Sequence, residues 1–213
     1  MKGSIPESLF RIPHLDTVWL DVNELNGSIP LNVANMSEVS SLWLYGNQLS
    51  GTISSSIGNC TKLVELYLND NQFVGDLPES LTNLKELMYL DVSNNSLEGT
   101  IQLGLGSFKQ MDTLVLSFNY FSSGIPPGLG NCSSLTQVVV FNSSFTRTSI
   151  ILGMELGPHK MMVGTASSGK ALRCGLWDRY VIQVLNEEKI LVLFVWLWVC
   201  IFGFDFDSNG CYI

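Results

Sequence analysis

The stretch LNDNQFVGDLPESLTNLKELMYLDVSNNSLEGT, residues 68–100, contains nearly the same sequence twice. Asn71 returns as Asn95, and Gly75 returns as Gly99, each 24 residues further along the chain. Self-similarity at a fixed period of this length is the sequence signature of architectures built from stacked repeats. The fold class therefore depends on how far the period extends in both directions.

The 24-residue period extends over residues 1–149. Its asparagine column contains Asn23, Asn47, Asn71, Asn95 and Asn119, followed by Ser143. Two apolar columns precede each asparagine as Val18/Leu20, Leu42/Leu44, Leu66/Leu68, Leu90/Val92, Leu114/Leu116 and Val138/Val140. A third apolar column and a glycine column share the period. These registered columns predict one repeat domain of about six units over residues 1–149.

Each column has a physical reason. Apolar residues spaced by two indicate a short β-strand with one buried face. An asparagine can satisfy backbone donors and acceptors where the chain leaves that strand, and a glycine allows a backbone path that a Cβ would obstruct. A single unit cannot bury its own apolar face, so neighbouring units are expected to stack around one shared core.

In four units a proline follows the apolar residue after the glycine, at Pro6, Pro30, Pro78 and Pro126. The combined pattern, L-x-x-L-x-L-x-x-N-x-L followed by L-x-G-x-I-P, resembles the leucine-rich repeats of plant receptor-like kinase ectodomains. The segments LYLNDNQFVGDLPESLTNLKELMYLDVSNNSLEG and LSFNYFSSGIPPGLGNCSSLTQ are most similar to the plant elicitor-peptide receptors. Those receptors are membrane kinases whose ectodomains bind short damage-signal peptides.

The resemblance implies a leucine-rich-repeat solenoid with a parallel β-sheet on its concave face. Short 3-10 or irregular segments are expected on its convex face. It also implies peptide recognition by the ectodomain of a receptor-like serine/threonine kinase, in defence or developmental signalling. In that family the ectodomain lies at the extracellular face of the plasma membrane, and a co-receptor kinase is an expected partner.

Side chains that alternate with the buried ones should point outward from the concave sheet. The candidate ligand-binding residues on this surface are Trp19, Asp21, Trp43, Tyr45, Glu65, Tyr67, Tyr89 and Asp91. Because neighbouring strands lie about 4.8 Å apart, the rings of Trp19, Trp43, Tyr45 and Tyr67 should form one ladder, surrounded by the carboxylates of Asp21, Glu65, Asp70 and Asp91. We interpret the surface as a groove for an extended, basic peptide. The alternative is that these aromatic residues only stabilise cross-strand pairs.

The charge of the repeat region agrees with a basic partner. The formal net charge of the chain is −8, and residues 1–149 hold six basic and thirteen acidic residues. An acidic domain disfavours binding to the nucleic-acid backbone. Charged residues make up only 14% of the chain and hydrophobic residues 46%, so a largely disordered protein is also disfavoured.

Six N-x-S/T sequons give candidate glycosylation sites at Asn26, Asn35, Asn59, Asn94, Asn131 and Asn142. Such sites indicate surface positions in a secretory protein, although an Asn-rich and Ser-rich repeat also creates them by composition. Cys60 and Cys132 share a buried column and lie three repeats apart, on the order of 15 Å along the stack. A disulfide needs Cα atoms within about 7 Å, so both are expected to be thiols in the core.

The ends of the repeat region carry no recognisable caps. The opening residues, MKGSIPESLFRI, contain neither the apolar core nor the cleavage site of a signal peptide. They match the second half of a unit whose strand half is missing. We interpret the chain as a truncated piece of a longer receptor without its kinase domain, and its own location is not fixed by the sequence.

Residues 150–213 are expected to form an aperiodic tail. Within it, residues 190–204, ILVLFVWLWVCIFGF, contain no charge. As a helix this segment would reach about 22 Å, short of a hydrocarbon core about 30 Å thick. Three interpretations stay open: non-native sequence such as a retained intron, a membrane segment, or a packed core.

The sequence does not predict an enzyme. Residues 164–171, GTASSGKA, nearly match a phosphate-binding loop, but Ala171 stands where a hydroxyl would bind magnesium. His14 and His159 are the only histidines and neither has a metal-ligand spacing, so no metal or cofactor is predicted. Two other hypotheses remain. One is a kinase-less repeat protein, such as a secreted cell-wall-enzyme inhibitor or a receptor-like protein. The other is a nucleotide-dependent enzyme formed by the tail.

Overall fold

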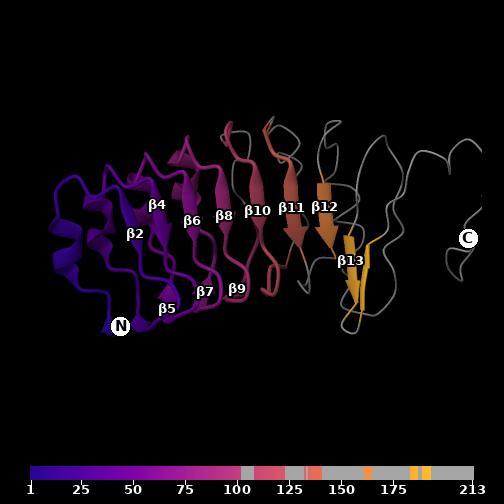
Figure 1. The fold of residues 1–213 in the computed structure, drawn as a ribbon, viewed down its shortest axis with the longest axis horizontal. Helices are drawn as coiled ribbons and strands as arrows, with labels where there is room; N and C mark the ends of the chain where they lie inside the picture. Colours follow the sequence, from indigo (N-terminus) through magenta and orange to yellow (C-terminus); the bar gives the residue numbers. More distant parts are fainter. Residues whose placement is uncertain are drawn as a thin grey trace, which may run out of the picture.

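The chain folds into a row of similar coils stacked side by side (Figure 1). The computed structural model describes residues 1–101, 108–122, 132 and 134–140, together with the backbone of residues 161–164, 183–186 and 189–192. Each coil that is described throughout contributes one strand to the concave sheet and one short 3-10 helix to the opposite side. The predicted leucine-rich-repeat solenoid is therefore confirmed.

The concave sheet is parallel, and each strand pairs with residues 24 positions further along the chain. Its first strands are β2 (Thr17–Trp19), β4 (Ser41–Trp43), β6 (Glu65–Tyr67), β8 (Tyr89–Asp91), β10 (Thr113–Val115) and β11 (Gln137–Val140). Val18, Leu42, Leu66 and Leu90 point from these strands into the core and are at most 4% exposed. The two-residue alternation in the sequence thus sets which face of the sheet is buried.

The strand ladder continues beyond residue 149. Strand β12 (Met161–Gly164) is parallel to β11 and keeps the 24-residue register, and β13 (Gln183–Asn186) follows it. Strand β14 (Lys189–Val192) is antiparallel to β13, so residues 190–192 of the apolar segment are part of a hairpin. The rest of residues 190–204, and the phosphate-loop-like residues 165–171, lie outside the described residues. The boundary at residue 149 remains a prediction.

A second parallel sheet runs beside the concave one, and the sequence did not predict it. It contains β1 (Lys2–Ser4), β3 (Glu24–Gly27), β5 (Gln48–Thr52), β7 (Gln72–Gly75) and β9 (Ser96–Leu97). The glycine column ends or interrupts these strands: Gly27, Gly51 and Gly75 have φ values of 77°, 77° and 76°. This left-handed region is open to glycine at no steric cost, which explains the column.

The convex side carries the 3-10 helices η1 (Glu7–Arg11), η2 (Leu31–Asn35), η3 (Ser55–Asn59) and η4 (Glu79–Asn83). Proline or serine precedes each helix in an extended conformation, with Pro30 at φ −63° and ψ 147°. Proline fixes φ in this range and lacks the N–H that a helix start leaves unbonded. Each of the last three helices buries one aliphatic side chain completely: Val33, Ile57 and Leu81. The predicted convex segments are confirmed.

The asparagine column joins consecutive coils. Asn95 donates from Nδ2 to the carbonyl of Leu68 in the preceding coil (3.0 Å) and to that of Val92 in its own coil (3.1 Å). Its Oδ1 accepts from the N–H of Phe73, again in the preceding coil (2.9 Å). Asn47, Asn71 and Asn119 repeat this arrangement. At the first coil, Asn23 bonds to two carbonyls of its own coil and accepts from the Met1 amine.

The residue before each asparagine turns the chain out of the concave strand. All five such residues have positive φ: Val22 (48°), Gly46 (66°), Asp70 (54°), Asn94 (50°) and Phe118 (54°). Only one of them is glycine. A β-branched residue is strongly disfavoured in the left-handed region, so the asparagine hydrogen bonds on the next residue must hold Val22 there.

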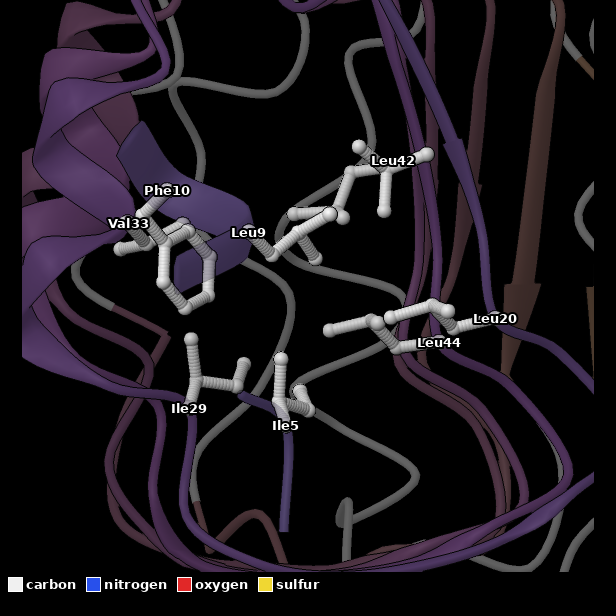
Figure 2. Close-up of a pocket in the computed structure, with 9 residues that line it drawn as sticks. Ile5, Leu9, Phe10, Leu20, Ile29, Val33, Leu42 and Leu44 are labelled. Carbon is white, nitrogen blue, oxygen red and sulfur yellow. The ribbon is translucent and has the colours of Figure 1, made fainter. Parts of the chain in front are cut away.

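Apolar side chains of the first coils surround a small pocket near the N-terminal end of the core. Figure 2 shows a pocket lined only by apolar side chains, among them Ile5, Leu9, Phe10, Leu20 and Leu44. No polar group converges on it, so it has none of the chemistry of an orienting ligand site. Since Ile5, Phe10 and Leu44 are at most 4% exposed, we interpret it as a packing gap between the first coils. Among the described residues, no helix is long and apolar enough to cross a membrane.

Both described cysteines lie in the core, as predicted. Cys60 is 0% and Cys132 is 1% exposed, and the Cys60 thiol donates to the carbonyl of Val33 at 3.2 Å. Burial raises the pKa of Cys60 to about 11. Because the thiolate is the reactive form of cysteine, the folded coil should protect this side chain from alkylation.

We expect Asn95→Ala to lower the free energy of unfolding by about 1–3 kcal/mol, because the buried N–H of Phe73 loses its acceptor. Urea unfolding of the full chain, followed by circular dichroism, measures this loss. Asn69→Ala is the matched control, since the side chain of Asn69 donates to the exposed Asp70 carboxylate rather than to a buried backbone group; its effect should stay within about 0.5 kcal/mol. Equal losses in the two variants would contradict the joining role of the asparagine column.

Native protein treated with iodoacetamide near pH 8 should remain unmodified at Cys60, and protein unfolded in urea should be modified there. Peptide mapping by mass spectrometry assigns the site, and the unfolded sample is the control for reagent and recovery. Rapid modification of Cys60 in the folded protein would show that this part of the core opens readily.

Candidate ligand-binding face

Four aromatic side chains from the first three concave strands and the turn after β4 form one cluster. The rings of Trp19 and Trp43 stack with centroids 4.9 Å apart and planes inclined by 22°. Tyr67 meets Trp43 edge-on, at 5.6 Å and 86°. Tyr45 lies 6.4 Å from both Trp43 and Tyr67. The structure therefore brings together the four rings that the sequence placed in one ladder, which we call the aromatic ladder.

Carboxylates lie beside the polar atoms of two inner rings of the ladder, Trp43 and Tyr45. The indole Nε1 of Trp43 donates to Oε2 of Glu65 at 3.0 Å, and the Ser41 hydroxyl donates to the same oxygen at 3.0 Å. Hydrogen bonding to the neighbouring Asp21 carboxylate is the main cause that raises the pKa of Tyr45. These bonds fix the ring orientations. The sequence predicted carboxylates near the rings but not these particular pairs.

Exposure differs along the ladder. Trp19, on the first strand, is 63% exposed, whereas Trp43, Tyr45 and Tyr67 are only half-buried. Burial is the main cause that raises the pKa of Tyr67, followed by the negative charge of Glu65. The ladder thus presents ring surface to solvent while each of its inner rings rests on a neighbour. Rigid aromatic surface of this kind is typical of binding sites.

The candidate residues of β8 lie beside the ladder rather than within it. Tyr89 pairs in register with Glu65 of β6, and the stacked and edge-on ring pairs among the described residues do not include it. Asp91 accepts from the backbone N–H and the hydroxyl of Ser93, at 2.8 and 2.6 Å. Burial nevertheless raises the pKa of Asp91, and its bonds to Ser93 only partly offset that effect.

Asp70 lies at the rim of the sheet. Its carboxylate accepts from the side-chain amides of Asn69 (2.6 Å) and Asn94 (2.7 Å). Beyond β8 the outward side chains change character, because Thr113, Val115 and Gln137 are neither aromatic nor charged. The concave face therefore has an aromatic and acidic half over β2 to β8, whereas the outward side chains of β10 and β11 are neutral and non-aromatic.

No basic side chain that the structure describes forms an ion pair with the acidic half. Among the described residues there are two ion pairs, Lys2 with Glu24 at 3.3 Å and Lys62 with Glu38 at 2.7 Å. The first pair joins the second sheet, and the second pair lies in the segments that lead into β4 and β6. Within the described part of the chain, the carboxylates around the ladder form no ion pair, so their negative charge is available to a ligand.

Other candidate sites can be placed as well. The sequon asparagines Asn26, Asn35, Asn59 and Asn94 are exposed, while Asn131 and Asn142 lie outside the described residues. Within the described part of the chain, no group of His, Cys, Asp and Glu side chains could hold a metal ion.

The family comparison agrees with this geometry. The leucine-rich-repeat model matches residues 38–60, 62–84, 86–108 and 110–132. No curated protein sequence matches the chain significantly. The protein is a leucine-rich-repeat solenoid.

Solved structures refine this class. The chain in the PEPR1–AtPEP1 crystal structure is 37% identical in sequence to this one, with a TM-score of 0.68. The alignment covers 86% of this chain and 27% of the matched chain. The ectodomain of GASSHO1/SCHENGEN3 from Arabidopsis thaliana, in complex with CASPARIAN STRIP INTEGRITY FACTOR 2, is 30% identical with a TM-score of 0.66. It covers 77% of this chain and 21% of that chain. The predicted resemblance to plant receptor-kinase ectodomains is thus confirmed, and this chain spans about a quarter of their length.

A third structure of this kind is the ectodomain of the Arabidopsis receptor kinase HAESA in complex with an IDA peptide hormone ligand that is lengthened at its N-terminus. It is 28% identical with a TM-score of 0.62, and covers 78% of this chain and 29% of that chain.

We expect Asp91→Asn to raise the melting temperature at pH 7. The raised pKa means that the folded state favours the protonated carboxyl, so Asp91 stabilises the fold at low pH and loses that contribution as the pH rises through its folded pKa. Asparagine keeps an oxygen acceptor for Ser93 without the buried charge. The difference should vanish toward about pH 3, below the ordinary pKa of aspartate.

Differential scanning calorimetry at several pH values tests this expectation. The exposed Glu98→Gln is the control for removing one carboxylate, and it should leave the melting temperature unchanged. A lower melting temperature for Asp91→Asn at pH 7 would mean that the hydrogen bonds to Ser93, rather than burial, dominate.

Proposed function

We propose that the concave face binds an extended peptide and that the chain is the peptide-recognition part of a plant receptor-like serine/threonine kinase. The observation that supports this proposal is the aromatic ladder, together with the Glu65 carboxylate that Ser41 and Trp43 hold by hydrogen bonds. Its rings are held in place before any ligand arrives, which lowers the entropy cost of binding. A flat surface of paired strands with exposed rings also suits an extended chain laid across it.

The similar solved structures support this proposal. HAESA carries the IDA peptide hormone in its structure, and PEPR1 and GASSHO1/SCHENGEN3 were solved with AtPEP1 and CASPARIAN STRIP INTEGRITY FACTOR 2. We propose an elicitor-peptide-like specificity, and hence a role in defence signalling, from the resemblance of the middle repeats. In this proposal the kinase activity lies outside the chain, and a co-receptor kinase completes the signalling complex.

The charge of the face supports a basic ligand. Asp21, Glu65, Asp70 and Asp91 lie on or beside the ladder, and no described basic residue faces them. Electrostatic attraction would speed the encounter with a basic peptide and favour it over acidic ones. We also propose that the face is extracellular, because the exposed sequon asparagines are available for glycosylation.

We expect Trp43→Ala and Tyr67→Ala each to weaken peptide binding at least about tenfold, since truncated aromatic anchors commonly cost about 2 kcal/mol. The probe is a peptide selected from a display library of random linear peptides on the full chain, and its dissociation constant is measured by calorimetry. Tyr120→Ala is the matched control. Tyr120 is 64% exposed and bonds to Leu97 only through its backbone N–H, away from the concave face.

Two outcomes would count against the proposal. If the library yields no saturable binder, the proposal that this chain recognises peptides is contradicted. Binders whose affinity is equal for the wild type, Trp43→Ala and Tyr67→Ala would place recognition elsewhere on the solenoid.

A further inference from the structure

Glu65 occupies the centre of the acidic half of the concave face. On the neighbouring strands, Ser41 and Tyr89 stand at the same register, one on each side. Tyr67 follows two residues later on the same strand and therefore points to the same face. Glu65 is thus enclosed by a hydroxyl donor, two phenol rings and the indole of Trp43.

The two hydrogen bonds to Glu65 end on one oxygen. Ser41 and Trp43 both donate to Oε2, and no described residue donates to Oε1. Since a carboxylate oxygen offers about two acceptor sites, Oε2 is saturated and Oε1 is available. The neighbouring donors also hold the carboxylate in one orientation, so a ligand would not have to order it.

The surroundings of Oε1 fit a planar cation. The hydroxyl of Tyr89 bonds to no described residue, and the Tyr67 ring lies close enough to Glu65 to feel its charge. A guanidinium can donate several N–H groups in its plane while it stacks on an aromatic ring. It is also hydrated more weakly than an ammonium group, which suits a position that is half-buried.

We propose that Glu65, Tyr67 and Tyr89 form a seat for one arginine side chain of the bound peptide. The guanidinium donates to Oε1 of Glu65 and stacks on a tyrosine ring. This inference rests on the proposed function, and it names the side chain that the face selects. Glu65 is then the residue that determines specificity, while the aromatic ladder supplies most of the contact area.

The test compares a selected peptide with its citrulline analogue, in which arginine is replaced by a neutral residue of nearly the same shape. Wild-type protein should bind the arginine peptide about ten to a hundred times more tightly, as expected for a hydrogen bond between charged partners. Glu65→Gln keeps an oxygen acceptor for Ser41 and Trp43. It should therefore melt like the wild type but bind the arginine and citrulline peptides with nearly equal affinity.

Asp70→Asn provides the matched control, because Asp70 is a carboxylate of the same face whose two oxygens already accept from Asn69 and Asn94. It should keep the preference for arginine. Retained preference in Glu65→Gln, or selected peptides without arginine enrichment, would overturn the seat while peptide binding stands. If no peptide binds to any variant or to the wild type, the proposed function itself fails.

Discussion

The hydrogen bonds of one asparagine per coil are the constraint on which the rest of the solenoid depends. Each such side chain, in Asn47, Asn71, Asn95 and Asn119, links backbone groups of its own coil and of the preceding coil. Buried backbone groups left without partners are costly, so the position where the chain leaves each concave strand is set by these bonds. That position determines the register of the sheet, and the register stacks Trp19, Trp43 and Tyr67 in line.

Much of the fold could be predicted because its period is visible in single residues. The inward pairs such as Leu66 and Leu68 identify strand β6 and its buried face directly. The second sheet could not be predicted in this way, since a strand such as Gln48–Thr52 buries only Leu49 fully and includes a glycine. Its hydrogen bonds come from stacking, not from local propensity. The left-handed turn at Val22, Asp70 and Phe118 could not be predicted either, because chemically unrelated side chains adopt the same backbone conformation there.

The candidate site was also predictable only in part. Alternation and strand spacing are sufficient to place Trp43 beside Trp19 and Tyr67. They do not predict the hydrogen-bond partners of the ring atoms, because Trp43 and Glu65 are 22 residues apart and meet only diagonally across two strands. Asp91 shows the same limit: it lies on the predicted face, yet the pattern does not reveal its hydrogen bonds to Ser93. Side-chain direction within a column depends on what the neighbouring coil offers, and a one-dimensional pattern does not contain that information.

Different residues of each coil hold the backbone and form the outer surface, and this separation has a consequence for the evolution of such proteins. Asparagine, leucine and glycine hold the backbone, and the outward positions of β2 to β11 take no part in that bonding. Residues as different as Trp43, Asp91 and Val115 occupy one column without altering the strand that carries it. Mutation can therefore rewrite the outer surface coil by coil while the framework persists. A lineage can acquire a new ligand by small steps, none of which requires a new fold.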